Sequence, residues 1–185
     1  MIIGVTGNTG AGKSTVANIL REKLKIKVLN ADKIARQALH KKNVRNALVM
    51  AFGSSVITNY KISRKNLAHV AFSSPSNVKK LNSITHPTIR KEIIRQMKNN
   101  IIIDAPLLIE GGFYKKCDYV ILVKCNTNKI LKRTQKRKYD VKERIRHQMD
   151  FEKKKRYADF VIDNNGSLKE TREQLKNIIS KLKNY

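Results

Sequence analysis

The sequence predicts an α/β fold in which a parallel β-sheet is covered by helices on both faces. Short apolar runs alternate with longer helical patterns, and a glycine-rich loop separates the first run from the first helix. Strands that alternate with helices pair in parallel, because each helix returns the chain to the same end of the sheet. Ligands of such sheets bind beyond the carboxyl ends of the strands, so function is expected in the loops there.

Five short apolar segments predict the strands. They are Ile2–Thr6, Ile26–Asn30, Ile101–Ala105, Tyr119–Val123 and Phe160–Asp163. A helix from about Ser14 to Lys25 is expected after the first strand, because apolar residues recur there at helical spacing. The second and third strands are separated by a polar, helical stretch over residues 31–99, in which Pro75 and Pro87 predict helix starts or kinks.

The end of the chain carries a helix-start signal. Ser167-Leu168-Lys169-Glu170 has the S-x-x-E form of a capping box, in which the first and last residues bond each other's backbone N–H groups. An amphipathic helix is therefore predicted to run from this point to about Lys183.

The net charge first suggests a nucleic-acid partner. The 185 residues include 40 Lys+Arg and 14 Asp+Glu, a net charge of +26. However, 28 of these cations are Lys and only 12 are Arg, and the chain is also rich in Ile and Asn, which share A/T-rich codons with Lys. Arg is the better reader of phosphates, and the aromatic content of 6% offers no stacking surface. A compositional bias is the favoured interpretation, and no nucleic-acid partner is expected.

Composition also predicts a cytoplasmic protein with a packed core. At 41% hydrophobic residues the chain can bury a core, but no apolar stretch approaches the roughly 20 residues of a membrane-spanning helix. Met1–Val5 runs directly into glycines without a basic leader. Cys117 and Cys125 are not in a C-x-x-C pattern, so we expect two reduced, partly buried thiols and no zinc site.

The glycine loop carries the strongest functional signal. Gly7-Asn8-Thr9-Gly10-Ala11-Gly12-Lys13-Ser14 matches G-x-x-x-x-G-K-[ST] in full and lies between a predicted strand and a predicted helix. Glycines let backbone N–H groups turn inward around phosphate oxygens at the positive end of the helix. Lys13 supplies a charge that follows the transferred phosphoryl group, and Ser14 offers a hydroxyl to Mg²⁺. The pattern predicts a nucleoside-triphosphate site; a structural turn is the alternative.

The remaining motifs favour a small-molecule kinase. No N-K-x-D motif for guanine recognition is present, and the one D-x-x-G, at residues 163–166, reads as a turn after a strand. Asp32, at the end of the second strand, is suited to orienting an attacking hydroxyl, although it could also be the N-cap of the next helix. Arg36, one helical turn on, could pair with Asp32 or with a phosphate of the acceptor.

A basic segment is a candidate lid. Residues 124–156 hold 14 basic and 4 acidic residues and contain two helical patterns, around Thr127–Lys138 and Val141–Lys155. Arg133 and Arg137 are spaced to share a helix face, from which they could clamp a triphosphate. An arginine in that role contributes roughly 10³–10⁵ in rate. The alternative is a solvated helix face enriched in Lys.

Together these segments resemble the dephospho-CoA kinase family over roughly residues 2–180. The resemblance is carried, in order, by the glycine loop, Asn30-Ala31-Asp32-Lys33-Ile34-Ala35-Arg36, His86-Pro87, Pro106-Leu107-Leu108-Ile109-Glu110, the lid and Ala158-Asp159-Phe160-Val161-Ile162-Asp163-Asn164. It implies transfer of the γ-phosphoryl group of ATP, with Mg²⁺, to the ribose 3′-hydroxyl of dephospho-CoA, the last step of coenzyme A synthesis. Another small-molecule kinase, for nucleosides or nucleoside monophosphates, is the alternative, and a nucleic-acid-binding ATPase is a more distant one.

The resemblance also implies an architecture like that of nucleoside-monophosphate kinases, built on a P-loop core with a five-stranded parallel sheet. The core is expected at about 1–30, 100–125 and 157–185, a helical acceptor-binding region at about 31–99, and the lid at about 126–156. The expected partners are ATP and dephospho-CoA, and the expected assembly is a monomer or a weak homo-oligomer without a membrane contact.

The residues carried across from the family divide into three sets. ATP is expected on Gly7, Gly10, Ala11, Gly12, Lys13, Ser14, Thr15, Arg133 and Arg137, of which Lys13 and Arg137 act in catalysis together with Asp32. The acceptor is expected on Asp32, Arg36, His86, Pro106, Leu107 and Leu108. Mg²⁺ is expected on Ser14, with Asp104 as a candidate that could equally be a residue of a structural turn.

The chain departs from the family at one position and leaves three others open. Asn30 stands where the family usually has an acid, which puts a water-mediated contact to Mg²⁺ there in doubt. Without the family, His86 reads as a helix-start residue before Pro87. Glu110 is expected to pair with a cation, and Lys154 to be a solvated charge, with a contact to the nucleotide as the alternative.

Overall fold

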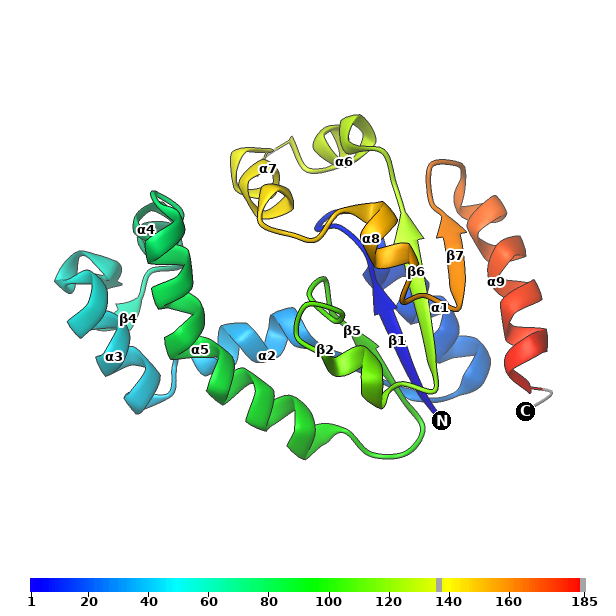
Figure 1. Ribbon diagram of the computed structural model, residues 1–185, viewed down its shortest axis with the longest axis horizontal. Helices are drawn as coiled ribbons and strands as arrows, with labels where there is room; N and C mark the ends of the chain where they lie inside the picture. Colours follow the sequence, from blue (N-terminus) through cyan, green and yellow to red (C-terminus); the bar gives the residue numbers. More distant parts are fainter. Residues whose placement is uncertain (136–137, 184–185) are drawn as a thin grey trace. The chain divides into compact units, whose positions relative to one another are not determined.

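The computed structural model describes residues 1–135 and 138–183. The chain divides into two compact units, one formed by Met1–Asn30 with Lys98–Tyr185 and the other by Ala31–Met97. The first unit contains the sheet, and the second is mainly helical (Figure 1).

A five-stranded parallel sheet forms the centre of the first unit, as the sequence predicts. Its strands are β1 (Ile2–Thr6), β2 (Lys27–Asn30), β5 (Ile101–Asp104), β6 (Tyr119–Lys124) and β7 (Phe160–Asp163), in the order β2-β5-β1-β6-β7. Each observed strand lies within one residue of the predicted bounds. β1 is the central strand, with Gly4 opposite Ile103 of β5 and Val120 of β6, so the loop after β1 leaves the middle of the carboxyl edge.

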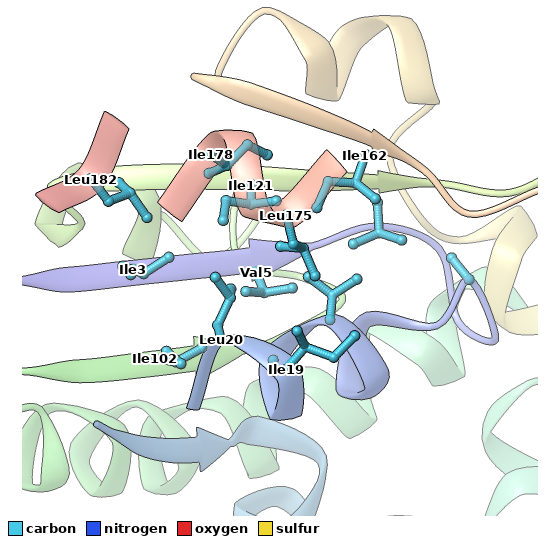
Figure 2. Close-up of a cluster of buried hydrophobic side chains, with 14 of the residues drawn as sticks. Ile3, Val5, Ile19, Leu20, Ile102, Ile121, Ile162, Leu175, Ile178 and Leu182 are labelled. Carbon is cyan, nitrogen blue, oxygen red and sulfur yellow. The ribbon is translucent and has the colours of Figure 1, made fainter. Parts of the chain in front are cut away.

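Two helices cover one face of this sheet. Alternate residues of the central strands, such as Ile3 and Val5, point to α1 (Lys13–Leu24) and α9 (Leu168–Lys183) and are fully buried. Figure 2 shows this core, to which α1 contributes Leu20 and α9 contributes Leu175. On the opposite face, a Cβ at Gly4 would lie 2.5 Å from Leu108, so the loop after β5 packs directly on the strand.

The capping box that the sequence predicts is confirmed. The backbone N–H of Ser167 donates to the Glu170 carboxylate at 2.6 Å, and the backbone N–H of Glu170 donates to the Ser167 hydroxyl at 3.3 Å. These two bonds satisfy N–H groups that the first turn of α9 cannot satisfy internally.

The segment after β6 differs from its prediction. It contains α6 (Thr127–Arg133), α7 (Lys138–Arg146) and α8 (Phe151–Lys155), where two longer helices were expected. The predicted helix over Val141–Lys155 is wrong as one element, because Asp150 interrupts it: its carboxylate accepts a hydrogen bond from the Glu152 N–H at 2.9 Å and starts a new helix. A short 3-10 helix, η2 (Phe113–Lys116), precedes β6.

The second unit packs its helices around a small core of its own. Its elements are α2 (Ala31–Ala38), α3 (Lys42–Phe52), η1 (Ser54–Val56), β3 (Ile57–Thr58), β4 (Lys61–Ile62), α4 (Arg64–Ala71) and α5 (Pro75–Gln96). The core comprises Val44, Leu48, Val56, Ile62 and Leu67.

One feature of this unit was not predicted from the sequence. β3 and β4 form a hairpin whose turn residues, Asn59 and Tyr60, both have positive φ, a conformation that Asn-Gly signals far more strongly than Asn-Tyr. Of the two prolines predicted at helix starts or kinks, Pro75 begins α5 and Pro87 lies inside that helix. The interpretation of His86 as a helix-start residue is therefore wrong, since it lies in the middle of α5.

The prediction for the cysteines is confirmed: Cys117 and Cys125 are free and partly buried. Burial, with a smaller contribution from Asp118 and Asp159, raises the pKa of Cys117 to about 12, so this thiol stays protonated at neutral pH. Among the described residues, no three His, Cys, Asp or Glu side chains gather as a metal site. Across residues 1–135 and 138–183, no helix is both long and apolar enough to span a bilayer.

Candidate active site

The loop between β1 and α1 is held in a conformation that residues other than glycine adopt only with strain. Gly7, Gly10 and Gly12 have φ angles of 140°, 85° and 97°. A Cβ on Gly7 would collide with the carbonyl oxygen of Val123 in β6, and one on Gly10 would lie 2.7 Å from Ile130. The loop is therefore pressed between neighbouring elements on both sides.

Asn164, the residue after β7, braces the same loop. A Cβ on Gly12 would collide with its amide nitrogen, which donates a 2.7 Å hydrogen bond to the carbonyl oxygen of Ala11. The Asn164 amide oxygen accepts a 2.9 Å bond from the buried hydroxyl of Thr171 in α9. A buried side-chain amide with both ends bonded fixes its neighbours more firmly than an exposed one.

Lys13 and the start of α1 give the loop its positive potential. The Lys13 side chain is buried, with 6% of its surface exposed, and its Nζ donates to the carbonyl oxygen of Asn8 at 3.0 Å. α1 begins at Lys13, directly after Gly12, which has no side chain to cap the helix. The first turn carries no acidic residue, so no side chain of the helix itself neutralises the positive end of the helix dipole, which favours an anion.

A buried carboxylate lies beside this helix start. Asp104, at the carboxyl end of β5, is 2% exposed, and its Oδ2 accepts hydrogen bonds from Ser14 Oγ at 2.6 Å and Asn30 Nδ2 at 2.8 Å. The sheet register explains the cluster, since Asn30 pairs directly with Asp104. A hydroxyl beside a carboxylate is the kind of oxygen donor set that Mg²⁺ prefers.

The loop after β5 combines packing with polar anchoring. Leu108 is fully buried, whereas Leu107 is 37% exposed, so an acceptor could contact the side chain of Leu107 but not that of Leu108. The carbonyl oxygen of Pro106 accepts bonds from the Thr6 hydroxyl at 3.4 Å and from Lys154 Nζ at 2.8 Å.

Lys154 is not a solvated charge, and that expectation is wrong. Its side chain is fully buried, and its Nζ lies 3.1 Å from Glu110 Oε1, which confirms Glu110 as the partner of a cation. Burial lowers the pKa of Lys154, while the nearby carboxylate of Glu110 opposes that shift. The pair ties α8 to the loop after β5.

Of the two arginines in the predicted lid, the structure describes only Arg133. Arg137 lies outside the described residues. Arg133, exposed on α6, donates from Nη2 to the carbonyl oxygen of Asn164 at 3.1 Å and from Nη1 to Cys125 Sγ at 3.6 Å. Asn164 in turn bonds the carbonyl oxygen of Ala11, so hydrogen bonds link Arg133 to the glycine loop through Asn164.

A cavity of about 590 Å³ lies beside the loop. Its walls are formed by Gly7 and Asn8, by residues 122–128 at the end of β6, and by residues of the segment 145–154. The cavity thus opens at the carboxyl edge of the sheet, where parallel sheets bind their ligands.

The other predicted site residues belong to the second unit. Asp32 is the second residue of α2 and is half-buried, so the N-cap interpretation is wrong because the residue already lies in the first helical turn. Arg36 is exposed in the last turn of the same helix. His86 is exposed on α5, and partial burial of its ring lowers its pKa, which favours the neutral form at neutral pH.

A second cavity, of about 300 Å³, lies within this unit between α2 and α5. Its cations are already paired, since Lys41 and Arg95 lie 3.6 Å and 2.5 Å from the Glu92 carboxylate. Hydrogen bonds from Arg95 and Gln96 lower the pKa of Glu92 to about 2, so the carboxylate stays charged. This cavity is therefore a poorer site for an anion than the glycine loop.

Sequence reasoning assigned no role to two residues that contact the loop. Asn164 could have been found, because it follows directly on a strand of the parallel sheet. Gln148, whose side-chain amide bonds Thr9, lies between two helices and carries no sequence signal.

Comparison with known proteins gives one consistent result. The family model described as CoaE, dephospho-CoA kinase, matches residues 1–170. A dephospho-CoA kinase of Aquifex aeolicus is 40% identical over 190 residues, covering 97% of this chain and 96% of its own.

Two solved structures extend the match to three dimensions. TT1252 from Thermus thermophilus has a TM-score of 0.76 at 33% identity, covering 98% of this chain and 97% of its own. The dephospho-CoA kinase from Campylobacter jejuni has a TM-score of 0.70 at 28% identity, covering 98% of this chain and 96% of its own. With its glycine loop, buried lysine and parallel sheet, the chain belongs to the dephospho-CoA kinase family of ATP-dependent kinases.

Proposed function

We propose that this protein transfers the γ-phosphoryl group of ATP to the ribose 3′-hydroxyl of dephospho-CoA, giving coenzyme A and ADP. The observation that carries the proposal is the glycine loop with its buried Lys13, in a chain of this family. Phosphoryl transfer needs positioning and charge stabilisation more than covalent help from the protein, and this loop supplies both.

ATP binds with its phosphates on the loop from Gly7 to Thr15 and the start of α1. The Lys13 ammonium donates to the carbonyl oxygen of Asn8 in its own loop, and that bond can be exchanged for one to a phosphate oxygen. Arg133 and Arg137 act from the lid on the same charge. Arg133 supports this role because it already bonds Asn164, the brace of the loop.

Ser14 and Asp104 are the residues that would hold Mg²⁺ with the nucleotide. The ion would neutralise charge on the β- and γ-phosphates. Asn30 keeps one amide hydrogen on Asp104, so in this chain it orients the carboxylate instead of contributing a second one.

Asp32 accepts the hydrogen bond of the attacking hydroxyl and orients it. It follows the carboxyl end of β2 by two residues, and Arg36 lies one turn further on for a phosphate of the acceptor. His86, Pro106, Leu107 and Leu108 are the other residues proposed for acceptor binding, and of the two leucines Leu107 has the side chain open to contact. We further propose a cytoplasmic monomer or weak homo-oligomer with no nucleic-acid partner.

The acceptor assay tests the proposal directly. Incubation with ATP, Mg²⁺ and dephospho-CoA should yield coenzyme A and ADP in equal amounts, measured by liquid chromatography. Lys13→Met should reduce the rate at least about 100-fold because it removes the phosphate-binding charge, whereas Lys23→Met, at an exposed position of α1, should not. No coenzyme A above the enzyme-free background, or faster transfer to a nucleoside or nucleoside monophosphate, would contradict the assignment.

Asp32→Asn should lower kcat by about 10²–10⁴-fold and leave ATP affinity within about twofold, because the side chain acts on the acceptor hydroxyl and not on ATP. Steady-state kinetics and calorimetric titration with ATP separate the two quantities. Glu173→Gln, at an exposed position of α9, is the control for loss of a carboxylate. An unchanged kcat would mean that another group orients the hydroxyl.

Asp104→Asn should raise the Mg²⁺ concentration for half-maximal ATP affinity about 10- to 100-fold, since the metal would lose a charged partner beside Ser14. ATP titrations at graded Mg²⁺ measure this without any turnover. Asp118→Asn is the matched control, because Asp118 precedes β6 at the opposite edge of the sheet. If both variants follow the Mg²⁺ dependence of the unaltered protein, Asp104 has no role toward the metal.

A further inference from the structure

The side chain of Gln148 makes two hydrogen bonds to one residue of the glycine loop. Its Oε1 accepts a hydrogen bond from the backbone N–H of Thr9 at 3.1 Å, and its Nε2 donates to the Thr9 hydroxyl at 2.9 Å. The two residues are 139 positions apart in the sequence. A planar amide bonded at both ends fixes the orientation of its partner as well as its distance.

The segment that carries Gln148 is itself anchored. We call residues 148–154 the stem; they follow α7 and include most of α8. The backbone N–H of Met149 donates to Glu110 Oε1 at 2.9 Å, and the same carboxylate pairs with the fully buried Lys154. Lys154 also donates to the carbonyl oxygen of Pro106 at 2.8 Å. The stem is therefore fixed to the loop after β5 while it holds the glycine loop through Gln148.

Gln148 bonds the half of the loop before Gly10, in which Lys13 Nζ also bonds the carbonyl oxygen of Asn8. Asn164 bonds Ala11, near the start of α1, whereas Gln148 bonds Thr9, next to Gly10 with its φ of 85°. Asn164 follows β7, whereas Gln148 lies between α7 and α8, and the two side chains bond residues on opposite sides of Gly10 in the sequence. Gln148 is also neutral, so it can lie beside a bound triphosphate without the repulsion that a carboxylate would add.

We propose that Gln148 is a positioning residue for the phosphate-binding loop: through its two bonds to Thr9, the stem sets the conformation in which the loop receives ATP. The inference rests on the proposed function only in taking this loop as the ATP site. The inference also assigns the stem to the part of the active site that does not move with the lid, whereas residues 126–156 as a whole were expected to form the lid.

Calorimetric titration with ATP and Mg²⁺ tests this without an acceptor. Gln148→Met keeps the length of the side chain but removes both bonds, and it should raise the Kd for ATP about 5- to 30-fold, the scale of one or two neutral hydrogen bonds. Thr9→Val removes only the hydroxyl and should raise the Kd about two- to fivefold. The double variant should match Gln148→Met within about twofold, because the hydroxyl has then already lost its partner.

Two controls accompany the cycle. Thr9→Ser keeps the hydroxyl and should bind ATP as the unaltered protein does. Gln135→Met changes an exposed glutamine of the preceding segment and should also leave the Kd unchanged. Thermal unfolding of every variant verifies that titrations are made on folded protein.

Three results would overturn the proposal. The first is a Kd for ATP of Gln148→Met within twofold of that of the unaltered protein. The second is a double variant whose Kd rises by the product of the two single effects. The third is a Gln148→Met protein with a lowered melting temperature and an unchanged ATP affinity. If the unaltered protein binds ATP but makes no coenzyme A, the proposed acceptor is wrong while the inference about Gln148 is still tested by the same titrations.

Discussion

The path of the backbone between β1 and α1 is the constraint on which the rest of the active site depends. Gly7, Gly10 and Gly12 hold φ angles that other residues adopt only with strain, and each has a neighbour where a side chain would begin. These neighbours come from β6, α6 and the end of β7. The loop conformation is therefore set by the packing of the whole sheet and not by the eight-residue motif alone.

Strand order turns this local constraint into a site. With β1 in the centre, the start of α1 lies beside the carboxyl ends of β5 and β6, so Ser14 meets Asp104 without a long connection. The polar groups that this brings together are well satisfied: in the described part of the chain, no buried side-chain nitrogen or oxygen lacks a hydrogen-bond partner. Such a network keeps donors oriented before the nucleotide arrives, which is how electrostatic stabilisation avoids reorganisation during the reaction.

Features encoded over short stretches could be predicted from the sequence. The five strands, the capping box at Ser167 and the glycine loop all depend on local patterns, and the structure has them at the predicted places. Features that depend on tertiary contacts could not. Lys154 looks like any other lysine in a basic run, and only the fold brings Glu110 and the Pro106 carbonyl around it. The interruption of the predicted helix before Asp150 and the hydrogen bonds between Gln148 and Thr9 were not predicted for the same reason.

Calorimetric titration of Gly12→Ala with ATP and Mg²⁺ tests most directly whether this packed loop is the nucleotide site. Gly112→Ala is the matched control, because Gly112 also has a positive φ, 72°, but nothing lies within 4 Å of the added Cβ. Both changes carry a backbone cost of roughly 1–2 kcal/mol, whereas only the first collides with Asn164. We predict that Gly12→Ala stays folded and loses ATP affinity at least about 30-fold, while Gly112→Ala binds ATP normally. A folded Gly12→Ala protein with unchanged affinity would contradict this account.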